Sequence, residues 1–130
     1  MTKTFTIQGD RIHNIQSFYN EINRAFMSNA DWKLAPSLDA LNDLFYGGFG
    51  EIEGNEEIIL IWTDFEKNRN DLGLELTKAY YQDKLNHPSK FNMDFVKNKL
   101  YELEHGTGKT YFEIILEIIE EHKNIKVIPQ

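Results

Sequence analysis

The stretch from residue 37 to residue 48 reads SLDALNDLFYGG and predicts a short helix. Ser37 can cap its N-terminus, because a serine hydroxyl accepts a hydrogen bond from a backbone N–H that the first helical turn leaves unpaired. Gly47 follows the last helical residues, where a left-handed C-terminal cap favours a residue without a Cβ atom. The apolar residues fall at helical spacing and predict a buried face formed by Leu38, Leu41, Leu44 and Phe45.

The same helix carries two aspartates four residues apart, Asp39 and Asp43, on a side away from the apolar positions. Like charges at this spacing repel each other by about 0.2–0.5 kcal/mol on an isolated helix. The helix dipole offsets part of this repulsion for Asp39 in the first turn, but not for Asp43. The pair is either an ordinary solvated acidic face or a surface that binds cations, and these residues alone leave both interpretations open.

Acidic residues are concentrated around this helix. Between residues 31 and 66 there are nine acids and the single base Lys33, in a chain whose total charge is −7. A concentrated negative field attracts basic proteins and repels nucleic acid. We therefore expect a basic protein partner and no binding of nucleic acid through this region.

Three segments read as strands, at residues 4–7, 58–62 and 125–128. The second, IILIW, is an unbroken apolar run, which is typical of a strand covered on both faces in a parallel sheet. Amphipathic helices separate the strands. With right-handed crossovers, this order predicts an α/β fold in which a small three-stranded parallel sheet is flanked by helices.

Two further helices have clear N-terminal signals. Asn14 can cap a helix whose apolar face is Ile15, Phe18, Ile22 and Phe26. Thr110 and Glu113 form a capping-box pattern before the helix at residues 111–119. His122 and Lys123 follow that last helix, where positive charge suits the helix dipole.

Several kinds of chemistry are not expected. The sequence has no cysteine, its four histidines are scattered, and no nucleophile–base pair can be identified, so we expect no metal, no cofactor and no catalytic residues. The segment GTGKT at residues 106–110 matches only the end of a phosphate-binding loop, because Leu103 stands where the loop needs a glycine. No apolar signal segment or membrane-length run is present, so a soluble cytoplasmic protein is expected.

The motif LDAL at residues 38–41, followed by Asp43, resembles the second helix of the barstar family of ribonuclease inhibitors. The strand ending in Ile61-Trp62, followed by Phe65, is similar to the central strand of that family and the turn after it. The resemblance covers about residues 4–65 and 110–128. It implies a single barstar-like domain over residues 1–130.

Residues 67–109 exceed the short connection typical of the family and predict a helical insertion. Two amphipathic patterns, separated at His87-Pro88, are carried by Leu72, Leu76, Ala79 and Tyr80 and by Phe91, Phe95, Leu100 and Leu103. The insertion could cover an exposed face, widen a binding surface or form a dimer contact. The sequence does not decide among these roles, and the oligomeric state stays open.

The resemblance also implies partner-binding residues. Asp39 and Asp43 match the principal acidic contacts of the family, and Glu117 matches a further one on the last helix. Asn42 and Lys33 stand where the family has aromatic contact residues. Phe49 is next to the position of a third family aromatic and is its candidate substitute.

From these residues we expect an inhibitor, or immunity-type protein, that binds and blocks a basic ribonuclease or toxin nuclease. Paired carboxylates on a rigid helix can take the place of RNA phosphates for the cations of such an enzyme. The alternative is a non-inhibitory protein–protein interaction module on a barstar-like fold.

Overall fold

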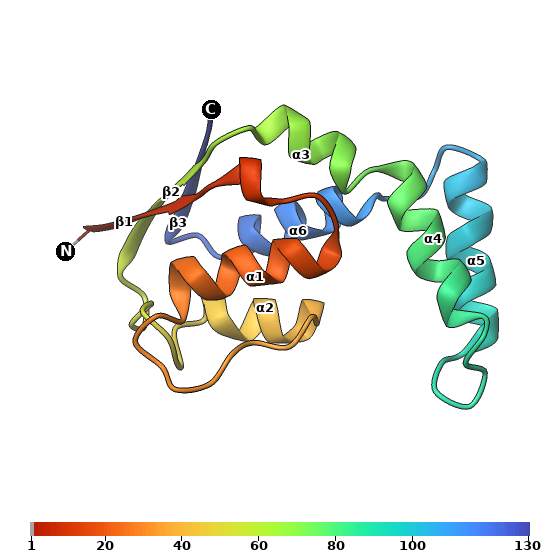
Figure 1. Cartoon of the computed structure of the whole chain (residues 1–130), viewed down its shortest axis with the longest axis horizontal. Coiled ribbons are helices and arrows are strands. Elements are labelled where there is room, and N and C mark those ends of the chain that lie inside the picture. The colour runs from red at the N-terminus through yellow and green to blue at the C-terminus, as the bar shows by residue number, and fades with distance from the viewer. Residues whose placement is uncertain (1) are drawn as a thin grey trace.

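The structure is a computed structural model that describes residues 2–130. Its sheet contains three parallel strands in the order β1-β2-β3 (Figure 1). Thr2 pairs with Glu57 at one end of the β1–β2 register, and Ile58 pairs with Ile125 in the β2–β3 register. The elements in chain order are β1 (Thr2–Ile7), the 3₁₀ turn η1 (Gly9–Arg11), α1 (Ile15–Phe26), α2 (Leu38–Phe45), β2 (Glu57–Trp62), α3 (Phe65–Asp71), α4 (Leu74–Lys84), α5 (Met93–Glu104), α6 (Tyr111–Glu120) and β3 (Ile125–Pro129). The predicted α/β fold with a small parallel sheet is confirmed.

The central strand β2 is covered unequally on its two faces. Alternate side chains of a strand point to opposite faces, and Ile58, Leu60 and Trp62 on one face are buried. Ile59 and Ile61 on the other face are only half-buried. The expectation of a strand fully covered on both faces is therefore wrong for the second face.

The main core forms around Trp62. Its ring lies 6.1 Å from that of Phe18 on α1 and 5.3 Å from that of Phe112 on α6. The hydroxyls of Tyr19 on α1 and Tyr111 on α6 are hydrogen-bonded at 2.8 Å, and burial raises the pKa of Tyr19 to about 12. These contacts join α1, β2 and α6 into one packed unit.

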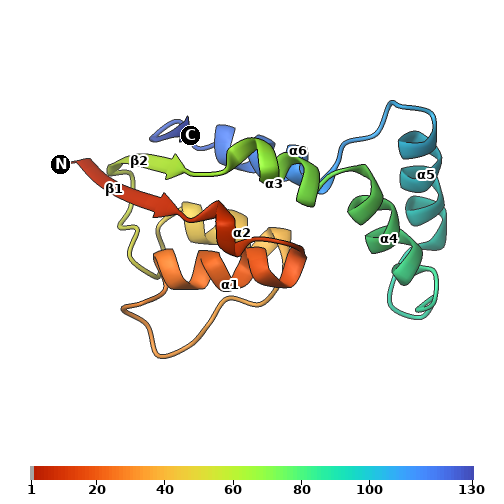
Figure 2. The ribbon, with the colours of Figure 1, turned by 45° about the horizontal axis from the view of Figure 1, so that its top comes forward.

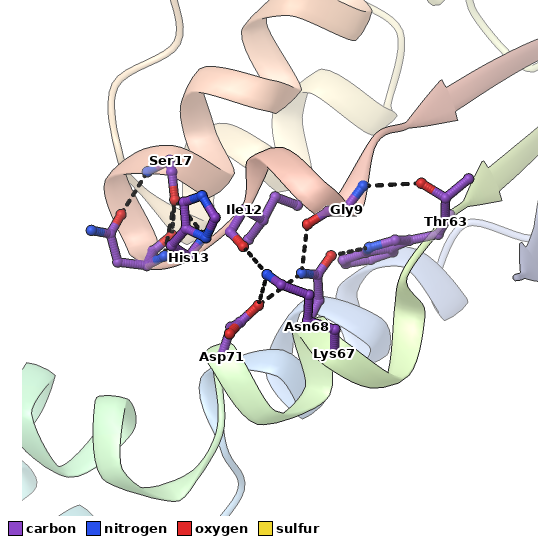
Figure 3. A network of polar contacts seen from close by, with 10 residues as sticks. Gly9, Ile12, His13, Ser17, Thr63, Lys67, Asn68 and Asp71 are labelled. Carbon is purple, nitrogen blue, oxygen red and sulfur yellow. Dashed lines mark hydrogen bonds and ion pairs between the residues drawn. The ribbon is translucent and has the colours of Figure 1, made fainter.

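A buried asparagine fixes α3 to the end of the sheet (Figure 3). The Asn68 amide nitrogen donates to the Gly9 carbonyl oxygen at 3.0 Å, and the Asn68 amide oxygen accepts from the Trp62 indole N–H at 2.7 Å. The Lys67 ammonium adds a bond of 2.8 Å to the Ile12 carbonyl oxygen. No side chain fits at Gly9, because a Cβ atom there would collide with the Thr63 carbonyl oxygen. The first part of the predicted insertion is thus tied into the core.

Helices α4 and α5 form an antiparallel hairpin at one end of the molecule, away from the sheet (Figures 1 and 2). The predicted break at His87-Pro88 lies between them, and the helical character expected of residues 67–109 is confirmed. The hairpin has a small core of its own, formed by Tyr81, Val96 and Leu103.

Among the described residues, no helix is both long and apolar enough to cross a bilayer.

The base of the hairpin is held by a buried threonine. The Thr77 hydroxyl donates to the Gly73 carbonyl oxygen at 2.7 Å and accepts from the Tyr111 backbone N–H at 2.8 Å. The Tyr80 ring packs edge-on against the Tyr111 ring, with centroids 5.2 Å apart. The first half of α4 is therefore fixed to α6 and to the main core.

Candidate protein-binding site

Helix α2 has the caps that its sequence predicts. The Ser37 hydroxyl accepts a hydrogen bond of 3.3 Å from the Ala40 backbone N–H. Gly47 adopts a φ of 84°, which favours glycine. Leu41, Leu44 and Phe45 are buried. Because both ends are capped and one face is packed into the core, α2 presents its other face as a rigid surface.

Asp39 and Asp43 are both exposed on this face. Within residues 2–130, neither carboxylate forms an ion pair or a side-chain hydrogen bond, whereas Glu21, Glu56, Glu66 and Asp71 each pair with a neighbouring base. The two aspartates are therefore available to cations from outside the chain.

Two exposed aromatic side chains, one at the end of α2 and one in the loop before it, were not expected from the sequence. Tyr46 is 65% exposed and Trp32 is 47% exposed. Tyr46 lies three residues after Asp43, so it continues the solvent-facing side of α2. This spacing was the signal that could have identified it. Trp32, in the loop before α2, had no comparable periodicity.

The residues expected to replace family aromatics lie in different surroundings. Lys33 is exposed in the loop before α2. Phe49 is half-buried and packs against Trp32, with ring centroids 5.0 Å apart. The Trp32–Phe49 pair thus forms an aromatic contact between the loops before and after α2, and the charged Lys33 is next to Trp32 in the sequence.

Asn42 connects α2 to the segment after α6. The His122 Nε2–H donates a hydrogen bond of 2.7 Å to the Asn42 side-chain oxygen. The His122 ring also contacts the Tyr46 ring edge-on, with centroids 4.6 Å apart. His122 is buried, and burial lowers its pKa. The expectation that His122 adds positive charge at the helix end is therefore wrong, because burial favours the neutral imidazole.

We expect acidification to destabilise the protein through His122. The unfolded histidine has a pKa near 6.5 and the folded one a lower pKa, so the unfolded state binds more protons between the two values. The stabilisation is full above about pH 6.5 and is lost as the pH falls towards the folded pKa. In thermal melts from pH 8 to pH 5, the difference in melting temperature between the wild type and His122→Gln should become smaller as the pH falls. A stability difference that does not change with pH would contradict this role.

Glu117 is on α6, which packs against α2. Within residues 2–130, no hydrogen bond links it to Asp39 or Asp43. Its carboxylate is exposed and forms an ion pair with the Lys109 ammonium. A partner that used Glu117 would have to compete with Lys109. Of the expected contacts, Asp39 and Asp43 lie together on one face of α2, with Asn42 half-buried between them in sequence.

The family model described as Barstar (barnase inhibitor) matches residues 2–85 of this chain. The match covers β1 to α4 and therefore includes the whole of α2. No curated protein and no solved structure matches the chain.

Proposed function

The chain belongs to the barstar family, and from this premise we propose that it binds and blocks a basic ribonuclease or toxin nuclease. The contact surface in this proposal is the exposed face of α2 with the loop before it. The protein acts by occupying its partner and contributes no catalytic group of its own.

The observation that carries the proposal is the pair Asp39 and Asp43, exposed and without partners in residues 2–130 on a capped helix. A ribonuclease gathers Arg, Lys and His side chains to hold the phosphates of RNA. Carboxylates form strong charge-assisted hydrogen bonds with such cations. A fixed helix presents the two acids without a large loss of conformational freedom on binding.

The exposed aromatic rings support the same use of this surface. Tyr and Trp contribute much of the binding energy in many protein interfaces. Tyr46 continues the aspartate face of α2, while Trp32, in the loop before α2, packs on Phe49 in the loop after it. The proposed contact surface therefore combines acids that attract a basic partner with rings that can be buried against it.

Two observations favour the alternative of a non-inhibitory interaction module. The Asn42 oxygen is already bonded to His122, and Lys33 presents a positive charge to an incoming basic protein. These two residues stand where related inhibitors are expected to have aromatic contacts. The partner in this alternative is a protein without nuclease activity.

A capture experiment separates the two functions. We expect the immobilised protein to retain a ribonuclease from the basic protein fraction of its source organism, detected by RNA cleavage after elution. The matched control is Asp39→Asn/Asp43→Asn, which keeps the size of both side chains and removes their charge. If the wild type, but not the double variant, retains only proteins without nuclease activity, the result supports the interaction module instead.

A further inference from the structure

We propose that the groove between α2 and α4 is part of the binding surface and receives an arginine or lysine side chain of the basic partner. This inference rests on the proposed function and names a second contact region for the same partner. The groove is lined on one side by Leu38 and Asp39 and on the other by Tyr80, Asp83, Lys84 and Phe91.

The position of the groove follows from the arrangement of the helices. The N-terminal end of α2 points towards the α4–α5 hairpin in both views (Figures 1 and 2). Asp39 is in the first turn of α2, and Asp83 is in the last turn of α4. A partner that covers the aspartate face of α2 therefore also reaches this groove.

The α2 wall of the groove is held by its cap and buried leucines, and the α4 wall is anchored at Thr77 and Tyr80 by their contacts to Tyr111. A preformed groove requires little ordering when it is filled, which favours binding.

The groove already holds one cation of the chain itself. The Lys84 ammonium lies 4.3 Å from the centroid of the Tyr80 ring and 4.7 Å from that of Phe91. Aromatic faces attract cations at such distances. Both rings therefore already attract a cation, and a cationic side chain of the partner would take the place of Lys84 on them.

The acids of the groove are not neutralised by this lysine. Within residues 2–130, the only ion pairs are those of other residues, and neither Asp39 nor Asp83 takes part in one. Carboxylates on opposite walls, with aromatic rings beside them, match the charge and the flat faces of a guanidinium group. We therefore assign the groove to a cationic side chain of the partner.

Phe91 would give this contact a part that the family match does not cover. The match ends at residue 85, so Phe91 and the turn between α4 and α5 lie outside it, while the other groove residues lie within it. The hairpin then has a recognition role in addition to covering part of the core.

The test compares the dissociation constants of purified variants for the ribonuclease recovered in the capture experiment. We expect Asp83→Asn and Phe91→Ala each to weaken binding about five-fold or more, the effect of losing a significant interface contact. Matched controls are Asp94→Asn and Tyr101→Ala, which change an exposed acid and an exposed ring on α5. We expect these controls to stay within about two-fold of the wild type.

Asp43→Ala serves as the reference for the proposed function. If Asp43→Ala weakens binding while Asp83→Asn and Phe91→Ala behave like their controls, the groove assignment is overturned and the proposed function stands. If none of the three variants weakens binding, the α2 surface is not the contact region and both proposals fail. Asp83→Asn alters an exposed side chain, so it remains a valid test even if Phe91→Ala disturbs the hairpin.

Discussion

Replacing Asp43 with alanine is expected to weaken binding of the nuclease by roughly thirty-fold to several thousand-fold. The range corresponds to about 2–5 kcal/mol, the general effect of removing one member of a charge pair buried in an interface. Most of this loss arises because the partner's cations stay desolvated without a counter-charge. Asp43 is exposed in the free protein, and its removal relieves about 0.2–0.5 kcal/mol of repulsion with Asp39. The melting temperature should therefore be unchanged or slightly higher.

Asp10→Ala is the matched control, because Asp10 is also exposed but belongs to η1. It removes the same charge and should leave the dissociation constant within about two-fold of the wild type. Calorimetric titration and thermal melts of the three proteins provide the comparison. An Asp43→Ala protein that binds as tightly as the wild type, or that unfolds, would show that this face of α2 has another purpose.

Among the variants proposed, Asn68→Ala is expected to lower the free energy of unfolding most, by about 2–5 kcal/mol. It should change binding only through the fraction of protein that is unfolded. The side chain is fully buried and serves two buried groups, the Trp62 indole N–H and the Gly9 carbonyl oxygen. Alanine would leave both unpaired, and each unsatisfied buried group costs about 1–3 kcal/mol. For a chain of this size, the melting temperature should fall by roughly 7–18 °C.

The control for this variant is Asn70→Ala, on the same helix two residues away. Asn70 is exposed, so its replacement should change the free energy of unfolding by less than about 0.5 kcal/mol. Chemical denaturation gives both free energies. Equal stabilities for Asn68→Ala and Asn70→Ala would mean that the network in Figure 3 does not hold α3 to the sheet.

The elements that sequence reasoning predicted well are those with local signals. Ser37 and Gly47 mark the ends of α2, and Thr110 with Glu113 marks the start of α6. Such caps involve residues three or four positions apart, so the sequence contains all the partners. The apolar spacing of α1 and the apolar run of β2 are equally local.

The features that the sequence did not reveal depend on contacts between distant segments. Asn42 and His122 are 80 residues apart, and the sequence gives no sign that they share a hydrogen bond. The half-buried outer face of β2 depends on where the helices pack, which the apolar run alone does not determine. The groove between α2 and α4 likewise joins residues about 40 positions apart, and the Thr77–Tyr111 bond that anchors α4 to α6 also spans distant segments.

The most direct test of the central claim is a titration of ribonuclease activity. The enzyme recovered by capture is mixed with increasing amounts of wild-type protein or of Asp39→Asn/Asp43→Asn, and RNA cleavage is measured. We predict that the wild type abolishes cleavage near a one-to-one ratio, whereas the double variant leaves the enzyme active at the same concentrations. Undiminished cleavage with the wild type, or equal inhibition by both proteins, would contradict recognition through the acidic face of α2.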